Sequence, residues 1–252
     1  MYCIGSDLEV QLLELEPEER GSPAAEALAP TVHEETRLRW AVATGCWLLV
    51  LVVAWGVTRL TCTVASLPYD CHELVLANSM LNLSDLLEKG VVIAALTRLP
   101  YSIHQRLSRR ALVGWTLVTV GSGPVFSALG QLHFLHQSLS TDTIQWNAAT
   151  GCYLGVGVLL LLVVGAHSIR VWQLPLTDRH LYVVSRLGLA LFYIAFLTTI
   201  GAHLHFHHYF IGLWVALLGY DEHWLSLGLI TVGSGIMAQG LGAYGVATLT
   251  DR

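Results

Sequence analysis

Long apolar runs separated by short polar segments dominate the chain from residue 40 onward. A helix that crosses a membrane needs about 20 mainly apolar residues. The stretches that reach this length with few or no charges are 40–58, 111–131, 148–168, 181–202 and 224–248. Because a backbone in lipid must pair every donor and acceptor internally, each stretch is predicted to be a helix. The pattern therefore predicts an all-α, polytopic membrane helix bundle.

The segment between the last two of these stretches decides the number of crossings. Its apolar part, residues 209–220, is short for an independent crossing. It can still cross if His207 and His208 sit in the headgroup layer, or if it packs inside the bundle. We therefore predict six spans, the additional one at 207–220, with five spans as the alternative. The run 90–96 is too short to cross, and we assign it to an amphipathic interfacial helix over residues 85–104.

Composition and charge support a membrane-embedded class. Apolar residues make up 54% of the chain and charged residues 12%, whereas a soluble domain carries about 25% charged residues. A soluble enzyme and a nucleic-acid binder both fit these values poorly. The formal charge of −5 is divided, because residues 1–36 carry nine acids and one base. We predict an acidic, mostly disordered tail at 1–36, or alternatively a docking peptide for a protein partner, before a transmembrane domain at 37–252.

The charges also bear on orientation, because positive residues favour the cytoplasmic side. The loops that follow the first and third predicted spans share a side and are rich in arginine, which favours a tail outside the cytoplasm. The sequon Asn82-Leu83-Ser84 would instead need the first loop to be lumenal. Cys62 and Cys71 form a disulfide only if that loop is lumenal, and both alternatives stay open.

Small and polar residues occur inside the predicted spans. Glycines in the third and last spans offer faces for close helix contact, and a gating hinge is the alternative. These glycines are Gly151, Gly155, Gly157, Gly235, Gly240 and Gly242. Arg186, near the start of the fourth span, is expected to extend to the membrane interface.

Histidines are the strongest candidates for chemistry, and the chain has 12 of them. Two helices separate the ends of the second and fourth spans, so the histidines at both ends face one side of the membrane in either orientation. Imidazole is the commonest metal ligand near neutral pH. His133 and His136 are three residues apart, and His203 and His207 are four apart, so each pair can lie on one face of a helix. We predict a site for zinc or iron, with copper and haem as further options. The candidate ligands are His133, His136, His203, His205, His207 and His208. The alternative is that these histidines only bind free carbonyl groups at helix ends.

Asp221, Glu222 and His223 form a second polar group before the last span. If the short segment crosses, they lie on the far side from the six histidines. If it is re-entrant, they lie beside them and can supply carboxylate ligands or a general base.

Two resemblances extend these predictions. His203-x-x-x-His207-His208 resembles the histidine boxes of membrane desaturases and hydroxylases, which need more ligands than the six histidines that this chain offers on that side. The C-terminal 50 or so residues are similar to the membrane region of eukaryotic LCCL-domain-containing membrane proteins. The matching elements are His203-Leu204-His205, His207-His208-Tyr209 and Gln239-Gly240-Leu241-Gly242-Ala243-Tyr244-Gly245. This resemblance implies a multi-pass membrane protein of unestablished chemistry, and no catalytic roles are carried over.

Two functional classes follow. The first is a metal-dependent membrane enzyme, such as a hydroxylase or desaturase acting on a lipid or another apolar substrate. The second is a non-enzymatic membrane scaffold or transport component. The sequence contains no nucleophile elbow and no phosphate-binding glycine loop.

Overall fold

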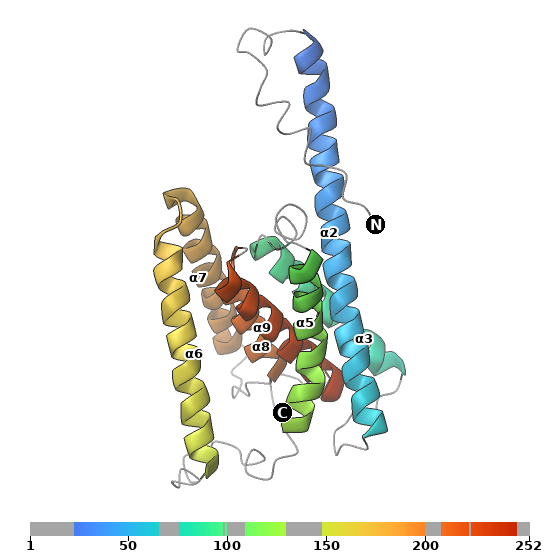
Figure 1. Cartoon of the computed structure of the whole chain (residues 1–252), viewed down its shortest axis with the longest axis vertical. Coiled ribbons are helices and arrows are strands. Elements are labelled where there is room, and N and C mark those ends of the chain that lie inside the picture. The colour runs from blue at the N-terminus through green and yellow to red at the C-terminus, as the bar shows by residue number, and fades with distance from the viewer. Residues whose placement is uncertain are drawn as a thin grey trace. The chain divides into compact units, whose positions relative to one another are not determined.

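A computed structural model of the chain describes residues 23–65, 76–97, 99, 109–129, 148–199, 208–221 and 223–245, which form helices and turns. The helices are α2 (Pro23–Val64), α3 (Leu76–Leu96), α5 (Arg109–Leu129), α6 (Ala148–Trp172), α7 (Leu176–Thr199), α8 (His208–Leu218) and α9 (Trp224–Ala243) (Figure 1). The predicted all-α class is confirmed for the part of the chain that the structure describes.

Four of these helices are long and apolar enough to cross a membrane. Their apolar stretches are Thr36–Val64, Arg110–Leu129, Leu154–Trp172 and Trp224–Ala243, and a shorter apolar helix covers Tyr209–Leu218. Helix α7, which contains most of the predicted fourth span, is not one of the four. These helices indicate a membrane protein. They do not by themselves confirm the predicted six spans.

Helix α2 extends through two compact units of the chain, residues 1–42 and residues 43–252. It begins at Pro23, so the last residues of the predicted tail are helical. Residues 1–22 lie outside the described part of the chain. The packing described below is that of the second unit alone.

Helix α9 lies at the centre of this unit, and glycines let its backbone approach α8 closely. A Cβ atom at Gly240 would lie 2.6 Å from the backbone nitrogen of Tyr209, and one at Gly219 would lie 2.7 Å from the carbonyl oxygen of Ser226. The start of α8 therefore lies against the end of α9, which makes the two helices antiparallel. This packing corresponds to the second condition for a short crossing, namely that the segment packs inside the bundle.

Helix α5 runs parallel to α9. A Cβ atom at Gly235 would lie 2.8 Å from Oγ of Ser122, and one at Gly123 would lie 3.8 Å from Cβ of Gln239. Higher residue numbers in α5 therefore face higher numbers in α9. Close contact through small residues is typical of helix pairs in membranes.

Helices α2 and α3 run in opposite directions against this pair. The indole Nε1 of Trp47 donates a hydrogen bond to the carbonyl oxygen of Gly90 at 3.0 Å. At the other end, Thr58 lies close to Gly242, and Asn82 lies 3.1 Å from the position of a Cβ atom at Gly245. Helix α2 is therefore parallel to α9 and α3 is antiparallel to it. The helix predicted over residues 85–104 in fact covers Leu76–Leu96.

Helices α6 and α7 follow one another through a short turn at residues 173–175, and the ring of His167 in α6 packs against that of Tyr182 in α7. The hydroxyl group of Tyr182, near the start of α7, donates to the carbonyl oxygen of Leu218 at the end of α8 at 2.8 Å. Successive helices from α2 to α9 therefore alternate in direction. We refer to the two ends of the bundle as the Trp224 end and the Ala243 end, after the two ends of α9.

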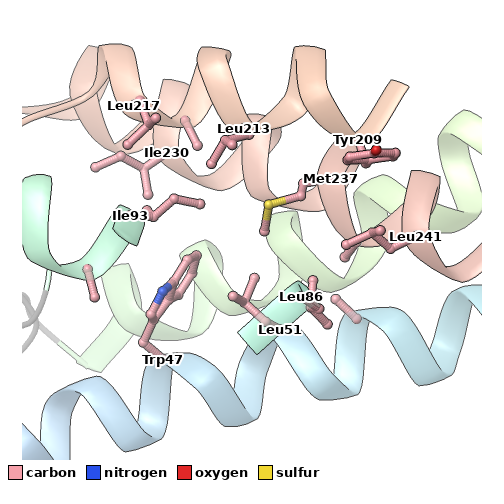
Figure 2. Packing of buried hydrophobic residues seen from close by; sticks show 14 of the residues in the cluster. Trp47, Leu51, Leu86, Ile93, Tyr209, Leu213, Leu217, Ile230, Met237 and Leu241 are labelled. Carbon is pink, nitrogen blue, oxygen red and sulfur yellow. The ribbon is translucent and has the colours of Figure 1, made fainter. Parts of the chain in front are cut away.

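The apolar core lies between α2 and α3 on one side and α8 and α9 on the other (Figure 2). Trp47 and Trp115 pack with their ring centroids 5.1 Å apart. The fully buried core residues include Trp47, Leu51, Leu86, Ile93, Leu217, Ile230, Met237 and Leu241. In the most apolar window of α9, 72% of the residues are buried, whereas in that of α6 only 11% are buried.

The glycine prediction holds for one helix and not for the other. Gly235, Gly240 and Gly242 of α9 all have close neighbours on other helices. Among the described residues, no atom lies within 4 Å of a Cβ position built at Gly151, Gly155 or Gly157 of α6. Close packing is therefore confirmed in α9, and α6 presents its glycines outward.

Candidate functional site

The six candidate metal ligands fall almost entirely outside the described residues. This holds for His133, His136, His203, His205 and His207, while His208 is the first residue of α8 and only its backbone is described. Among the residues that the structure does describe, no three side chains are grouped so that they could hold a metal ion. The ligand set therefore stays a prediction.

The structure does describe the helix ends to which the histidine-bearing segments are attached. Helix α5 ends at Leu129, just before His133 and His136. Helix α8 begins at His208, just after the run that starts at His203. Because α5 is parallel and α8 antiparallel to α9, both attachment points lie at the Ala243 end. The two histidine-bearing segments themselves lie outside the described residues, so their shared side stays a prediction.

Asp221 and His223 lie at the opposite end, in the turn between α8 and α9. The backbone N–H of His223 donates to Oδ1 of Asp221 at 3.3 Å, and Nδ1 of His223 accepts from the backbone N–H of Leu225 at 3.3 Å. His223 is thus the N-cap of α9. Asp221 and His223 therefore lie at the end of the bundle opposite to Leu129 and His208, as expected if the short segment crosses. Glu222 lies outside the described residues.

Arg186 is the centre of a polar junction at the Trp224 end. Its Nε atom donates to the carbonyl oxygen of Leu217 at 2.9 Å, and one terminal nitrogen donates to the carbonyl oxygens of Gly219 at 3.0 Å and Leu96 at 2.6 Å. The other terminal nitrogen donates to Oγ of Ser185 at 2.8 Å. Only 9% of Arg186 is exposed, so it does not extend to the membrane interface as expected. Its guanidinium instead binds carbonyl groups that the ends of α3 and α8 leave free.

Aromatic rings surround this guanidinium. The carbon atom Cζ of Arg186 lies 4.4 Å from the ring centroid of Tyr182 and 5.6 Å from that of Tyr220. The ring of His167, from α6, packs edge-on against Tyr182 at 6.1 Å between centroids. His167 is 2% exposed, and neither of its ring nitrogens has a hydrogen-bond partner among the described residues.

Sequence reasoning identified Arg186 and missed the junction that it forms. The usable signal is that Arg186 and His167 are ionisable residues inside long apolar stretches, where such residues are costly and commonly paired or functional. Tyr182 and Tyr220 give no signal of their own, because tyrosines are also frequent at membrane interfaces.

Two further observations concern covalent chemistry. Cys62, in the last turns of α2 near the Ala243 end, is fully buried and disulfide-bonded. Its proposed partner, Cys71, lies outside the described residues, while Cys46 is free and exposed.

Asn82 of the sequon is 2% exposed within α3, and this burial argues against a glycan at that position.

Comparison with protein-family models, curated proteins and solved structures finds no match to the chain. The resemblance to the membrane region of LCCL-domain-containing proteins therefore stays a prediction.

Proposed function

We propose that the chain is a multi-pass integral membrane protein that binds a transition metal ion, zinc or iron, through histidines at the Ala243 end. One observation carries this proposal. The helix ends that flank the two histidine-bearing segments, Leu129 of α5 and His208 of α8, belong to the same end of the bundle.

The spacing of the histidines adds chemical support. His133 and His136 are three residues apart, and His203 and His207 are four apart, so each pair fits one face of a helical turn. Zinc needs four ligands in a structural site and three in a catalytic one. Six imidazoles from two segments are enough for either kind of site. Neutral imidazole nitrogens also suit iron and copper, so the metal must be identified by measurement.

Metal analysis of the purified full-length protein in detergent tests this proposal. We expect a stoichiometric metal ion that is lost in the double variant His207→Ala/His208→Ala and in His133→Ala/His136→Ala. His180→Ala is the matched control, because His180 is exposed and lies at the Trp224 end. This control variant should keep the metal.

Thermal unfolding of each variant separates loss of ligands from loss of fold. A folded wild-type protein without metal would contradict the proposal and favour the scaffold or transport alternative. Retention of metal by both double variants would assign it to other residues. Either result would leave the helical arrangement at the Ala243 end unchanged.

A further inference from the structure

We infer that α3 crosses the membrane, which gives seven crossings in total, and that the Ala243 end faces the exoplasmic side. The histidine site of the proposed function would then draw its metal from outside the cytosol. Only this last consequence rests on the proposed function, since the crossings and their orientation are argued from other residues.

The direction of α3 is the first argument. Its Gly90 lies against Trp47 and Leu51 of α2, and its Asn82 lies near Gly245, beyond the end of α9. Its 21 residues correspond to a length of about 31 Å, similar to the hydrocarbon thickness of a bilayer. Helix α3 therefore covers the depth of the bundle, and its two ends, Leu76 and Leu96, lie at opposite ends of the bundle.

Charge compensation inside the bundle is the second argument. The ammonium group of Lys89 forms an ion pair with Asp85 one turn earlier, and both side chains are largely buried. The same ammonium group lies 5.6 Å from the ring centroid of Tyr209 of α8. Two of the three charges of α3 are thus paired within the protein, which lowers the cost of placing the helix in lipid. The third charge, Glu88, lies on the exposed face.

The distribution of bases is the third argument, and it changes once α3 crosses. Of the 13 Lys and Arg residues, Lys89 and Arg186 are inside the bundle, and only Arg59 and Arg252 belong to the Ala243 end. All the others precede the first crossing in the sequence or belong to segments that are joined to helix ends at the Trp224 end. Those residues are Arg20, Arg37, Arg39, Arg98, Arg106, Arg109, Arg110, Arg170 and Arg179. Bases accumulate on the cytoplasmic side, so the Trp224 end is assigned to the cytosol.

The disulfide of Cys62 gives an independent indication of the same orientation. Cys62 lies close to Val64, the last residue of α2, and therefore near the Ala243 end. Disulfides persist in oxidising compartments and are rare in the cytosol. The side with few bases is thus also the side with the disulfide. This assignment reverses the orientation that the sequence favoured when 59–110 was treated as one loop.

Glycosylation mapping tests the inference on the full-length chain. Acceptor sequons are inserted singly within residues 66–75, 97–108 and 130–147, and each variant is translated in the presence of endoplasmic reticulum microsomes. The background is Ser84→Ala, which removes the native sequon through an exposed residue and leaves the buried Asn82 intact. We expect one glycan on acceptors in 66–75 and 130–147 and none in 97–108.

Each other outcome overturns a defined part of the inference. The same result for 66–75 and 97–108 would show that α3 does not cross. Modification of 97–108 alone would keep the crossing and reverse the orientation. Protease treatment of sealed, right-side-out membrane vesicles provides a second measurement without any insertion. The acidic tail should be protected, and digestion of the tail would contradict the orientation. None of these readouts depends on bound metal, so they can fail or succeed independently of the proposed function.

Discussion

At the scale of single residues, Arg186 shows how carbonyl groups stabilise a buried charge. Among the described residues, no carboxylate forms an ion pair with it. Its guanidinium donates to carbonyl groups of Leu96, Leu217 and Gly219, which belong to the ends of two helices. Helix C-termini carry partial negative charge, so their dipoles also favour a cation there. Hydrogen bonds to a charged group contribute about 1.5–3 kcal/mol each, which offsets the cost of burying the charge.

The position of Arg186 in the sequence is visible, but its environment is not. Near the start of an apolar stretch, an arginine can extend to the interface or turn inward. The choice depends on whether free carbonyl groups of other helices reach it, and Leu96 is 90 residues away in the sequence. No local pattern contains this information.

We predict that Arg186→Met destabilises the bundle strongly, whereas Arg170→Met does not. Each buried carbonyl group left without a donor costs about 1–3 kcal/mol, so the loss for Arg186→Met should amount to several kcal/mol. Arg170 is exposed at the same end of the bundle, which makes it a matched control for the removal of one positive charge. Unfolding in mixed detergent micelles, followed by circular dichroism, measures both. Equal stability of the two variants would contradict the assigned role.

At the scale of whole helices, α3 marks the limit of hydropathy patterns. On the insertion scale each Leu, Ile or Val contributes about −0.3 to −0.6 kcal/mol, whereas a charged residue at the helix centre costs about 2.5–3.5 kcal/mol. The three charges of α3 thus outweigh its apolar residues when the helix is considered alone. Pairing of Asp85 with Lys89 removes most of that penalty, and Tyr209 adds a contact from a different helix. The bounds of α5 to α9 were predicted to within a few residues, whereas α2 begins at Pro23, well before the predicted start of its span at residue 40.

We predict that Asp85 and Lys89 are coupled. Asp85→Leu or Lys89→Leu alone leaves one unpaired charge inside the bundle and should lower stability. The double variant removes both charges and should recover at least about 1 kcal/mol relative to the sum of the single effects. Glu88→Leu is the control, because Glu88 is exposed on the same helix turn, and it should be neutral or stabilising. Additive single effects in detergent unfolding would show that the pair does not compensate charge.

At the scale of the whole molecule, the distribution of polar and apolar residues is that of a protein with an apolar exterior. Helix α9 lies at the centre, and its buried residues include the polar Ser226, Ser234 and Gln239. Helix α6 exposes many large apolar residues, such as Leu161 and Leu162. An apolar exterior of this kind is compatible with lipid as the surrounding solvent.

This inside–outside distribution explains what the sequence could establish about the fold. Apolar length predicted the helices other than α3, and their alternation is the reason for expecting both histidine segments at one end. The sequence did not distinguish α6 from α9, because both are glycine-rich apolar helices of similar length. Only tertiary contacts determine which glycines face a neighbouring backbone.

We therefore predict that replacing a glycine at the centre of the bundle lowers stability more than replacing one at its periphery. A Cβ atom at Gly233 of α9 would lie 2.6 Å from the carbonyl oxygen of Gly212 in α8, and neither backbone can move without displacing its helix. Gly233→Ala should cost about 1–3 kcal/mol or more, as overpacked cores do. Gly155→Ala in α6 meets open space and should be neutral or slightly stabilising, because alanine favours helix. Thermal unfolding of both variants in the same detergent provides the comparison. Equal effects would contradict the close packing of α8 against α9 and the central position of α9.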